Sequence, residues 1–178
     1  MEKINIVWFK RDFRLVDHKP LQRAIEEGTT LLLLYIQEPE LWEDEHMDHR
    51  HNRCIYQSLH SMNKQLSAFD QRIVVMEGNP INVFKYIHQR YSVHHVFSHQ
   101  ETGLRQTYQR DLQLKDFFKA SSIEWKEFQR NGVQRGLKNR DSWRKAWYSY
   151  MNSPIDVVDH AQLPHSPSGD SLPELDWP

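Results

Sequence analysis

Side chains that could bind a ligand gather where three apolar segments of the sequence end. They include cations, a carboxylate, an imidazole and an aromatic ring, a combination that suits a polar, planar molecule. We select six residues as the lining of a binding crevice: Lys10, Arg11, Tyr35, Gln37, His99 and Glu101. Taken singly, each of them could instead be an ordinary solvated loop residue.

The loop after the first apolar segment argues against two common chemistries. Residues 10–17 contain no glycine, and neither GxGxxG nor GxxxxGKS/T occurs in the sequence. Because a glycine-free turn cannot bring its backbone close to a pyrophosphate in the usual way, conventional NAD binding and P-loop hydrolysis are disfavoured. No Ser-His-Asp set or carboxylate pair has a spacing that implies hydrolysis, so we predict no catalytic residue.

A group of histidines raises the alternative of a metal site. His46, His49 and His51 lie close to Asp48, but so polar a segment is more simply interpreted as a loop and an exposed helix start. We therefore predict no metal ligand. The single cysteine, Cys54, excludes an internal disulfide and a CxxC motif, and its place on an apolar stripe puts it in the core.

Strand patterns alternate with helix patterns along the chain. β-Branched, aromatic and apolar stretches predict five strands, at residues 4–9, 31–36, 72–76, 94–97 and 123–128. Helical spacing predicts helices at about 18–27, 54–69, from 80 onward, at 104–118 and at 142–151. Such alternation predicts an α/β fold, a three-layer Rossmann-like domain with a five-stranded parallel sheet.

The strand order is not fixed by pattern, and we favour 3-2-1-4-5, which places the first and fourth strands side by side at the switch point. Ligands of such sheets bind beyond the carboxyl ends of the strands. The exits of these two strands should therefore meet and form a slot for a flat molecule. Residues 1–151 make up this domain, and residues 152–178, rich in Pro, Ser and His, form an irregular linker start.

The composition narrows the possible partners. The chain has 23 Lys and Arg against 24 Asp and Glu, so it lacks the strongly basic charge of a nucleic-acid-binding domain. The longest apolar run, residues 31–36, is too short to cross a bilayer, and no targeting segment is visible. We expect a cytoplasmic protein with no membrane partner. Among the tryptophans, Trp8 and Trp125 fall in strands and Trp143 and Trp147 share a helix face, which favours core packing or a domain contact.

Residues 8–18, WFKRDFRLVDH, resemble the opening signature of DNA photolyases and cryptochromes, W-F-K/R-R-D-L/F-R-L-x-D-N/H. Further similarities follow in the family's order, at residues 35–39 (YIQEP), at Arg53, Ser58 and Leu59, and at 74–80 (VVMEGNP), 99–101 (HQE) and 110–111 (RD). The resemblance covers roughly residues 4–151. Residues 131–140, with Trp143 and Trp147, depart from the family's P-Y-x-V-F-T-P-F-type stretch and resemble a divergent photolyase-like branch.

The resemblance implies an amino-terminal antenna domain, which in this family carries a light-harvesting pigment: a folate, a deazaflavin or a flavin-like compound. A separate helical carboxy-terminal domain binds FAD and damaged DNA. The resemblance therefore implies that FAD and DNA engage only the full-length protein, a deoxyribodipyrimidine photolyase or a related cryptochrome, for light-driven repair or signalling. This antenna half would pass excitation to FAD in the missing domain, its partner, without being catalytic itself.

Two alternatives from other classes remain. One is a stand-alone nucleotide-binding or stress-response-type α/β module, although such proteins usually show a glycine-containing phosphate loop near the carboxy terminus. The other is an interaction domain that docks onto a partner through the face of Trp143 and Trp147.

Overall fold

The computed structural model describes residues 1–178 except 43–46, 138, 169–171, 174 and 176–178. The strands are β1 (Lys3–Phe9), β2 (Leu31–Gln37), β3 (Ile73–Glu77), β4 (Ser92–His99) and β5 (Glu124–Phe128). The helices are α1 (Lys19–Glu27), α2 (Pro39–Trp42), α3 (His49–Leu66), α4 (Pro80–His88), α5 (Arg105–Ala120) and α6 (Trp143–Met151). Two short 3₁₀ helices, η1 (Ser67–Phe69) and η2 (His160–Gln162), complete the set.

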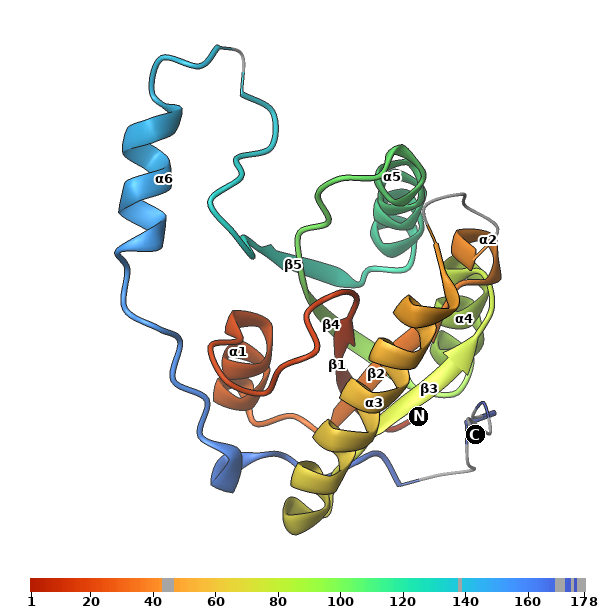
Figure 1. The fold of residues 1–178 in the computed structure, drawn as a ribbon. Coiled ribbons are helices and arrows are strands. Elements are labelled where there is room, and N and C mark those ends of the chain that lie inside the picture. Colours follow the sequence, from red (N-terminus) through yellow and green to blue (C-terminus); the bar gives the residue numbers. More distant parts are fainter. Residues whose placement is uncertain (43–46, 138, 169–171, 174, 176–178) are drawn as a thin grey trace.

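The predicted sheet is confirmed in both direction and order. Its five strands run parallel in the order β3-β2-β1-β4-β5 (Figure 1). β2 is buried along residues 31–36, as its continuous apolar run predicts for a strand covered on both faces. β5 lies at an edge, in agreement with its alternating apolar and charged residues.

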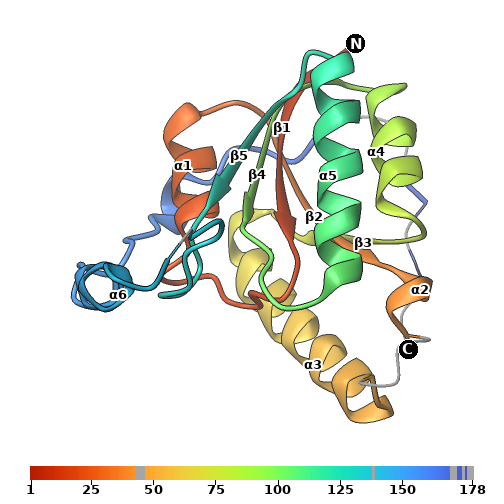
Figure 2. The ribbon, with the colours of Figure 1, turned by 90° about the horizontal axis from the view of Figure 1, so that it is seen from above.

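Helices cover both faces of the sheet, which gives three layers. α1 and α3 lie on one face and α4 and α5 on the other (Figure 2). Successive side chains of a strand point to opposite faces, so Ile6 and Trp8 join the core under α4 and α5 while Val7 and Phe9 join the core under α1 and α3. Each strand therefore contributes side chains to two hydrophobic cores. This packing holds the last residues of the strands in place at the carboxyl end of the sheet.

The start of α3 confirms the structural interpretation of the histidine segment and corrects the placement of Cys54. Asp48 caps the helix by accepting the Arg50 N–H, and the His51 ring accepts the Asp48 N–H. His46 lies outside the described residues. Cys54 is exposed, and the prediction that it joins the core is wrong. It precedes the buried Leu59 by five positions, which turns it about 140° around the helix from the buried stripe.

α6 stands apart from the sheet (Figure 1). None of its residues is buried, and Trp143 and Trp147 are 42% and 36% exposed. The prediction of core packing is therefore wrong for these two tryptophans, and the alternative prediction of a domain contact remains. Trp8 and Trp125 do pack in the core as predicted, with ring centroids 6.1 Å apart.

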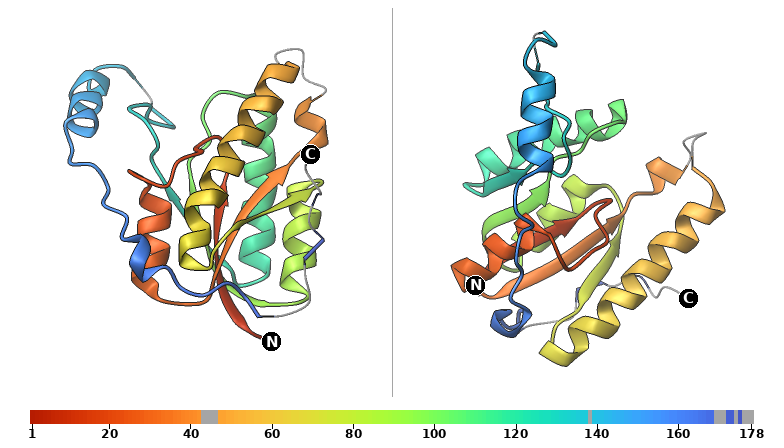
Figure 3. Two further views of the ribbon diagram at one scale, coloured as in Figure 1. Left: turned by 60° about the horizontal axis from the view of Figure 1, so that its bottom comes forward. Right: turned by 60° about the vertical axis from the view of Figure 1, so that its left-hand side comes forward.

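The segment after α6 returns along the domain, past α1 and the end of α3 (Figure 3). It is irregular apart from η2, and it is tied to the body at several points. Lys19 pairs with Asp156 at 2.8 Å, and the Leu31 N–H donates to the His165 carbonyl at 3.0 Å. Leu172 packs into the core and is only 7% exposed. Among the described helices, none combines the length and the apolar character that crossing a bilayer requires.

Candidate functional site

A pocket lies beyond the carboxyl ends of β1 and β2, where the fold predicts a ligand site. Four of the six residues selected from the sequence line it: Lys10, Arg11, Tyr35 and Glu101. The remaining walls come from the last residues of the strands, from α2 and its neighbourhood, and from α3 and α5: Trp8, Phe9, Ile36, Glu38, Leu41, Trp42, Met47, Ile55 and Arg110. Its volume is about 50 Å³.

The exits of β1 and β4 meet at this edge, because the two strands pair directly. Arg11, on the turn after β1, lies 3.6 Å from a Glu101 carboxylate oxygen beyond β4. Asp12 contacts His99 at the end of β4 at 2.5 Å. The exits of β1 and β4, which the strand order predicts as the two sides of a slot, are therefore adjacent in the structure.

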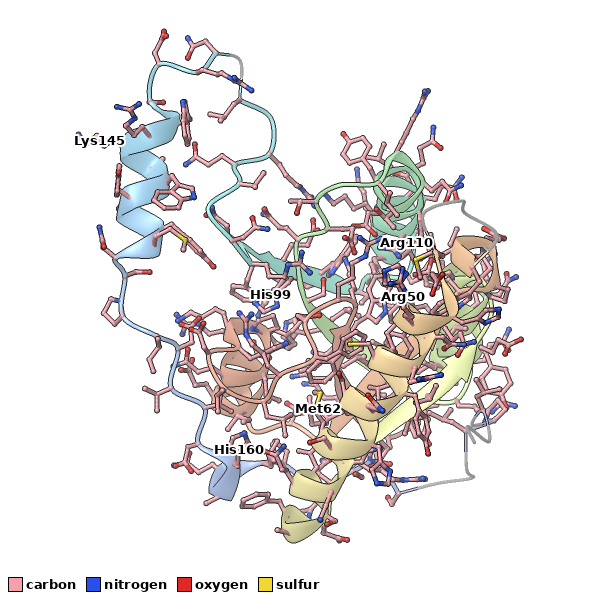
Figure 4. All side chains as sticks on the ribbon, in the orientation of Figure 1. Arg50, Met62, His99, Arg110, Lys145 and His160 are labelled. Atoms are coloured by element: carbon pink, nitrogen blue, oxygen red, sulfur yellow. The ribbon has the colours of Figure 1, made fainter. Side chains whose placement is uncertain are left out.

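Buried charges form a network along one wall of the pocket. Lys10 Nζ lies 3.2 Å from Asp111, and Arg110 contacts the same carboxylate at 2.7 Å. Arg110 also pairs with Glu38 and approaches Glu101 at 3.9 Å (Figure 4 labels Arg110). Cations and carboxylates offset one another within this network, so little uncompensated charge faces the pocket.

Burial changes the protonation behaviour of two members of this network. Burial lowers the pKa of Lys10, although the Asp111 carboxylate opposes the change. Burial raises the pKa of Glu38 to about 7, against the attraction of Arg110. Glu38 therefore changes charge near neutral pH, and the pairing that holds Arg110 in the wall changes with it.

Two tryptophans hold the Lys10 side chain in place. Its ammonium group lies 4.4 Å from the Trp8 ring centroid and 4.9 Å from that of Trp125. Cation–π attraction is strongest where the charge is desolvated, as it is here. The back of the pocket is consequently rigid, while Arg11, at the rim, is substantially exposed.

His99 takes part in a buried cluster beside the pocket. Asp12 accepts hydrogen bonds from the ring nitrogens of His18 and His99 and from the Lys10 N–H. Burial alone would raise the pKa of Asp12, but these donors hold it well below its usual range. The other ring nitrogen of His18 accepts the Leu21 N–H, so Nε2 carries the proton that Asp12 receives.

These three residues have the types and proximity of a metal centre. The tautomer of His18 argues against that role, because its Nε2 donates a proton and offers no lone pair to a metal. The Lys10 N–H, the His18 Nε2–H and the Leu21 N–H each have an acceptor within the cluster. We therefore interpret Asp12, His18 and His99 as a connector that joins the ends of β1 and β4 to the start of α1.

Gln37 ends β2 beside the pocket and is not among its lining residues. Its side-chain oxygen is buried without a hydrogen-bond partner among the described residues. Glu101 Oε1, on a lining residue, likewise accepts no hydrogen bond from the described residues, although the Arg11 guanidinium lies 3.6 Å from it. Buried acceptors without donors are costly, so these oxygens mark where a ligand N–H or O–H would be stabilised.

Three residues of the network were not among the six selected from the sequence: Glu38, Arg110 and Asp111. A signal was present for the last two: they continue the buried stripe of α5, three or four positions before Leu114. Charged residues on a helix stripe that is otherwise apolar indicate a buried polar network. Glu38 carried a different signal, because it closely follows the second predicted strand and so lies at the edge of the sheet where a ligand is expected.

Comparison with known proteins identifies a matching family model and relatives of similar sequence. The sequence model of the family described as DNA photolyase matches residues 5–135. The cryptochrome DASH of Synechocystis is 26% identical over 101 residues, which cover 54% of this chain and 21% of that protein. The deoxyribodipyrimidine photo-lyase of Buchnera aphidicola is 24% identical over 167 residues, covering 90% and 34% respectively.

Solved structures with low sequence identity share the fold. The Synechocystis sp. PCC6803 cryptochrome superimposes with a TM-score of 0.75 at 21% identity, covering 94% of this chain and 38% of that one. The archaeal photolyase of Sulfolobus tokodaii, solved with two FAD molecules, gives 0.70 at 17% identity, covering 86% and 36%. This chain thus spans a fifth to two fifths of these relatives.

Proposed function

Because the DNA photolyase model matches most of its length, the chain belongs to the DNA photolyase family as the amino-terminal domain that photolyases and cryptochromes share, and we propose that it is a light-harvesting domain. In this proposal it holds an antenna pigment, a folate, a deazaflavin or a flavin-like compound. The pigment passes excitation to FAD in a helical domain of the complete protein, which also binds damaged DNA. No bond is made or broken in the domain described here.

The observation that carries the proposal is the pocket at the meeting of the β1 and β4 exits. Glu101 Oε1 at its wall accepts no hydrogen bond from the described residues, and the Arg11 guanidinium lies 3.6 Å from it. Pterin and isoalloxazine rings present N–H donors at their edges, and a buried carboxylate is a strong acceptor for them. Tyr35 supplies an aromatic face and Arg11 a cation at the rim. Gln37 adds a second buried acceptor nearby, and His99 positions the turn through Asp12.

The size of the pocket sets a condition on binding. About 50 Å³ holds one or two water molecules and not a fused ring system. Arg110, Glu38 and Leu41 line both this pocket and a second one of about 230 Å³, whose lining also includes Gln106 and Gln109. Rotation of the long side chains of Arg110 and Glu38 would join the spaces, so the proposal requires that pigment binding displaces the Arg110–Glu38 pair.

When bound, the pigment supplies near-ultraviolet or blue absorption and resonance transfer of the excitation. The residues of the chain orient the ring and exclude water from it. The Sulfolobus tokodaii photolyase was solved with two FAD molecules, which imply a novel light-harvesting cofactor in that protein. They support the proposal through the shared fold.

The test is direct titration of the purified chain with a folate, a deazaflavin and FMN. We expect saturable binding of at least one of them, seen as a shift in its absorbance spectrum. Glu101→Ala should weaken that binding at least about 10-fold, since it removes a charge-assisted hydrogen bond. Glu26→Ala removes an exposed carboxylate of α1 and serves as the matched control.

ATP and AMP, followed by thermal shift, test the nucleotide-binding alternative in the same preparation. Stabilisation by these nucleotides and by none of the three pigments would replace the antenna proposal with that alternative. Failure of every ligand to bind would remove the antenna proposal and leave the fold assignment unchanged.

A further inference from the structure

The nearly neutral composition of the chain conceals a separation of charge. Residues 130–151, which we call the basic arm, contain six of the 23 Lys and Arg residues and only one of the 24 acidic ones, Asp141. The rest of the chain is therefore acidic. The arm comprises the loop after β5 and the whole of α6, the part that stands away from the sheet (Figure 1).

The cations of the arm are available to a partner. Arg140, Arg144 and Lys145 are exposed, and none of them forms an ion pair with any other described residue. Figure 4 shows Lys145 on the side of α6 that faces away from the body. Of the arm cations that the structure describes, only Arg135 is paired, with Glu127 at 3.1 Å. Charges left unpaired on a protruding element favour a polyanionic partner.

Aromatic rings are interleaved with these cations. Trp143, Trp147 and Tyr148 are 42%, 36% and 54% exposed, and the Trp147 and Tyr148 rings form an edge-to-face pair at 5.1 Å. A helix of this length has little stability of its own in water. It is held because the Trp147 indole lies against Gly132 and the Tyr150 hydroxyl donates to the Gln129 carbonyl at 3.0 Å.

A cleft of about 760 Å³ lies between the arm and the body. Its lining combines the rings of Phe128 and Tyr150 with three cations and two carboxylates, and it continues along the segment after α6. Arg14 pairs with Asp17 and Lys19 with Asp156, so that among the described residues Arg130 is the lining cation without an ion pair. This space is large enough for an unpaired nucleobase with its sugar. It is separate from the pocket at the ends of β1 and β2, with which it shares no lining residue.

From the unpaired cations and the exposed rings of α6 and the loop before it, we infer that the basic arm binds single-stranded nucleic acid without sequence preference. Arg140, Arg144 and Lys145 contact phosphates, and Trp143 and Tyr148 stack with bases that a single strand leaves free. A duplex keeps its bases stacked internally and cannot use the rings. An apolar protein partner would bury these cations unpaired, at a substantial cost in desolvation.

The test is fluorescence anisotropy of a labelled thymidine 12-mer titrated with the chain at several salt concentrations. We expect log K to fall linearly with log salt, with a slope of about −2 for three phosphate contacts. The variant R140Q/R144Q/K145Q should lose most of that slope. W143A/Y148A should weaken binding at least about fivefold and leave the slope unchanged, since stacking releases no counterions.

A matched control removes the same charge elsewhere. R53Q/K64Q/K119Q takes three exposed cations from α3 and α5, and it should bind as the parent chain does. An equal loss of affinity in this control would show that binding depends only on net charge, and it would overturn the inference. Circular dichroism and the unfolding midpoint, which exposed substitutions should leave unchanged, establish that each variant is folded.

Three other results would also overturn the inference. One is the absence of binding at about 50 mM salt, where phosphate contacts are strong. Another is equal affinity for a duplex 12-mer or for polyphosphate, either of which would exclude base stacking. The third is self-association in sedimentation that W143A/Y148A abolishes, which would make the arm an interface between copies of this chain. None of these results depends on pigment binding.

Discussion

Asp12 is the residue through which the turn after β1 is fixed to its neighbours. Its carboxylate accepts from His18, from His99 and from the Lys10 backbone, and its side chain is 1% exposed. An isosteric amide has one acceptor oxygen and adds two donors, so at least one buried donor in the cluster would lose its partner.

We therefore predict that Asp12→Asn lowers the free energy of unfolding by about 2–4 kcal/mol at neutral pH. The measurement is denaturant unfolding followed by circular dichroism. The depressed pKa of Asp12 means that its contribution is present above the unfolded-state pKa and is lost as the pH falls below it. Asp116→Asn, an exposed site on α5, is the control, and an equal loss there would contradict the argument.

Glu38 gives a prediction with the opposite dependence on pH. Its folded-state pKa is about 7, above the usual 4.5, because burial penalises the carboxylate. As the pH rises from about 4.5 to about 7, the unfolded chain has already lost this proton while the folded chain retains it, so the folded state is progressively destabilised.

Glu38→Gln removes that titration and keeps an acceptor for Arg110. We expect the variant to gain about 1–3 kcal/mol in unfolding free energy relative to the parent chain between pH 4.5 and 7.5. Unfolding curves at several pH values test this. Glu40→Gln, exposed on α2, should show no such trend, and a flat difference for Glu38→Gln would contradict the buried ionisation.

At the scale of elements, α6 and the loop before it depend on one glycine. A β-carbon at Gly132 would lie 2.0 Å from Trp147 Cδ1, so any side chain there displaces the indole. The sheet has no share in this contact, because no residue of α6 is buried.

Gly132→Ala should therefore loosen α6 while the sheet remains intact. We expect faster proteolysis within residues 129–151 and a free energy of unfolding that changes by less than about 0.5 kcal/mol, since surface changes outside a core are small. Ser149→Ala, on the exposed side of α6, should alter neither quantity. A large fall in global stability would show that the arm is part of the cooperative unit.

At the scale of the whole molecule, the segment after α6 closes over the end of the sheet. Gln71 is one of its attachments: the side chain donates to the Pro164 carbonyl and to the Leu31 carbonyl and accepts from Ser166. This buried amide connects the start of β2 to a segment more than 90 positions away in the sequence.

Gln71→Ala should release that segment and cost about 1–3 kcal/mol, because it leaves buried carbonyls without donors. Faster proteolytic cleavage in residues 152–168, together with a lower unfolding midpoint, is the expected result. Gln65→Ala, which removes an exposed amide of α3 that contacts only its own helix, should change neither. Unchanged cleavage in Gln71→Ala would show that other contacts suffice to hold the segment.

Most of the fold was predictable because it depends on local pattern. The apolar run of β2, the alternation in β5 and the glycine after α1 determine element types within a few residues of themselves. The residues after each strand were identifiable as site candidates for the same reason, since parallel strands end at a common edge. Lys10, Arg11, Tyr35 and Glu101 were found in this way.

The sequence by itself determined the five strands, the helices other than the short α2, the family and the sheet edge where polar residues gather. Only the tertiary structure decided that Arg110 and Glu38, 72 positions apart, form one wall, and that His99 is engaged by Asp12 beside the pocket. It also placed Cys54 and α6 outside the core. Periodicity reports which face of an element is apolar, whereas these outcomes depend on which distant side chains the packed layers bring into contact.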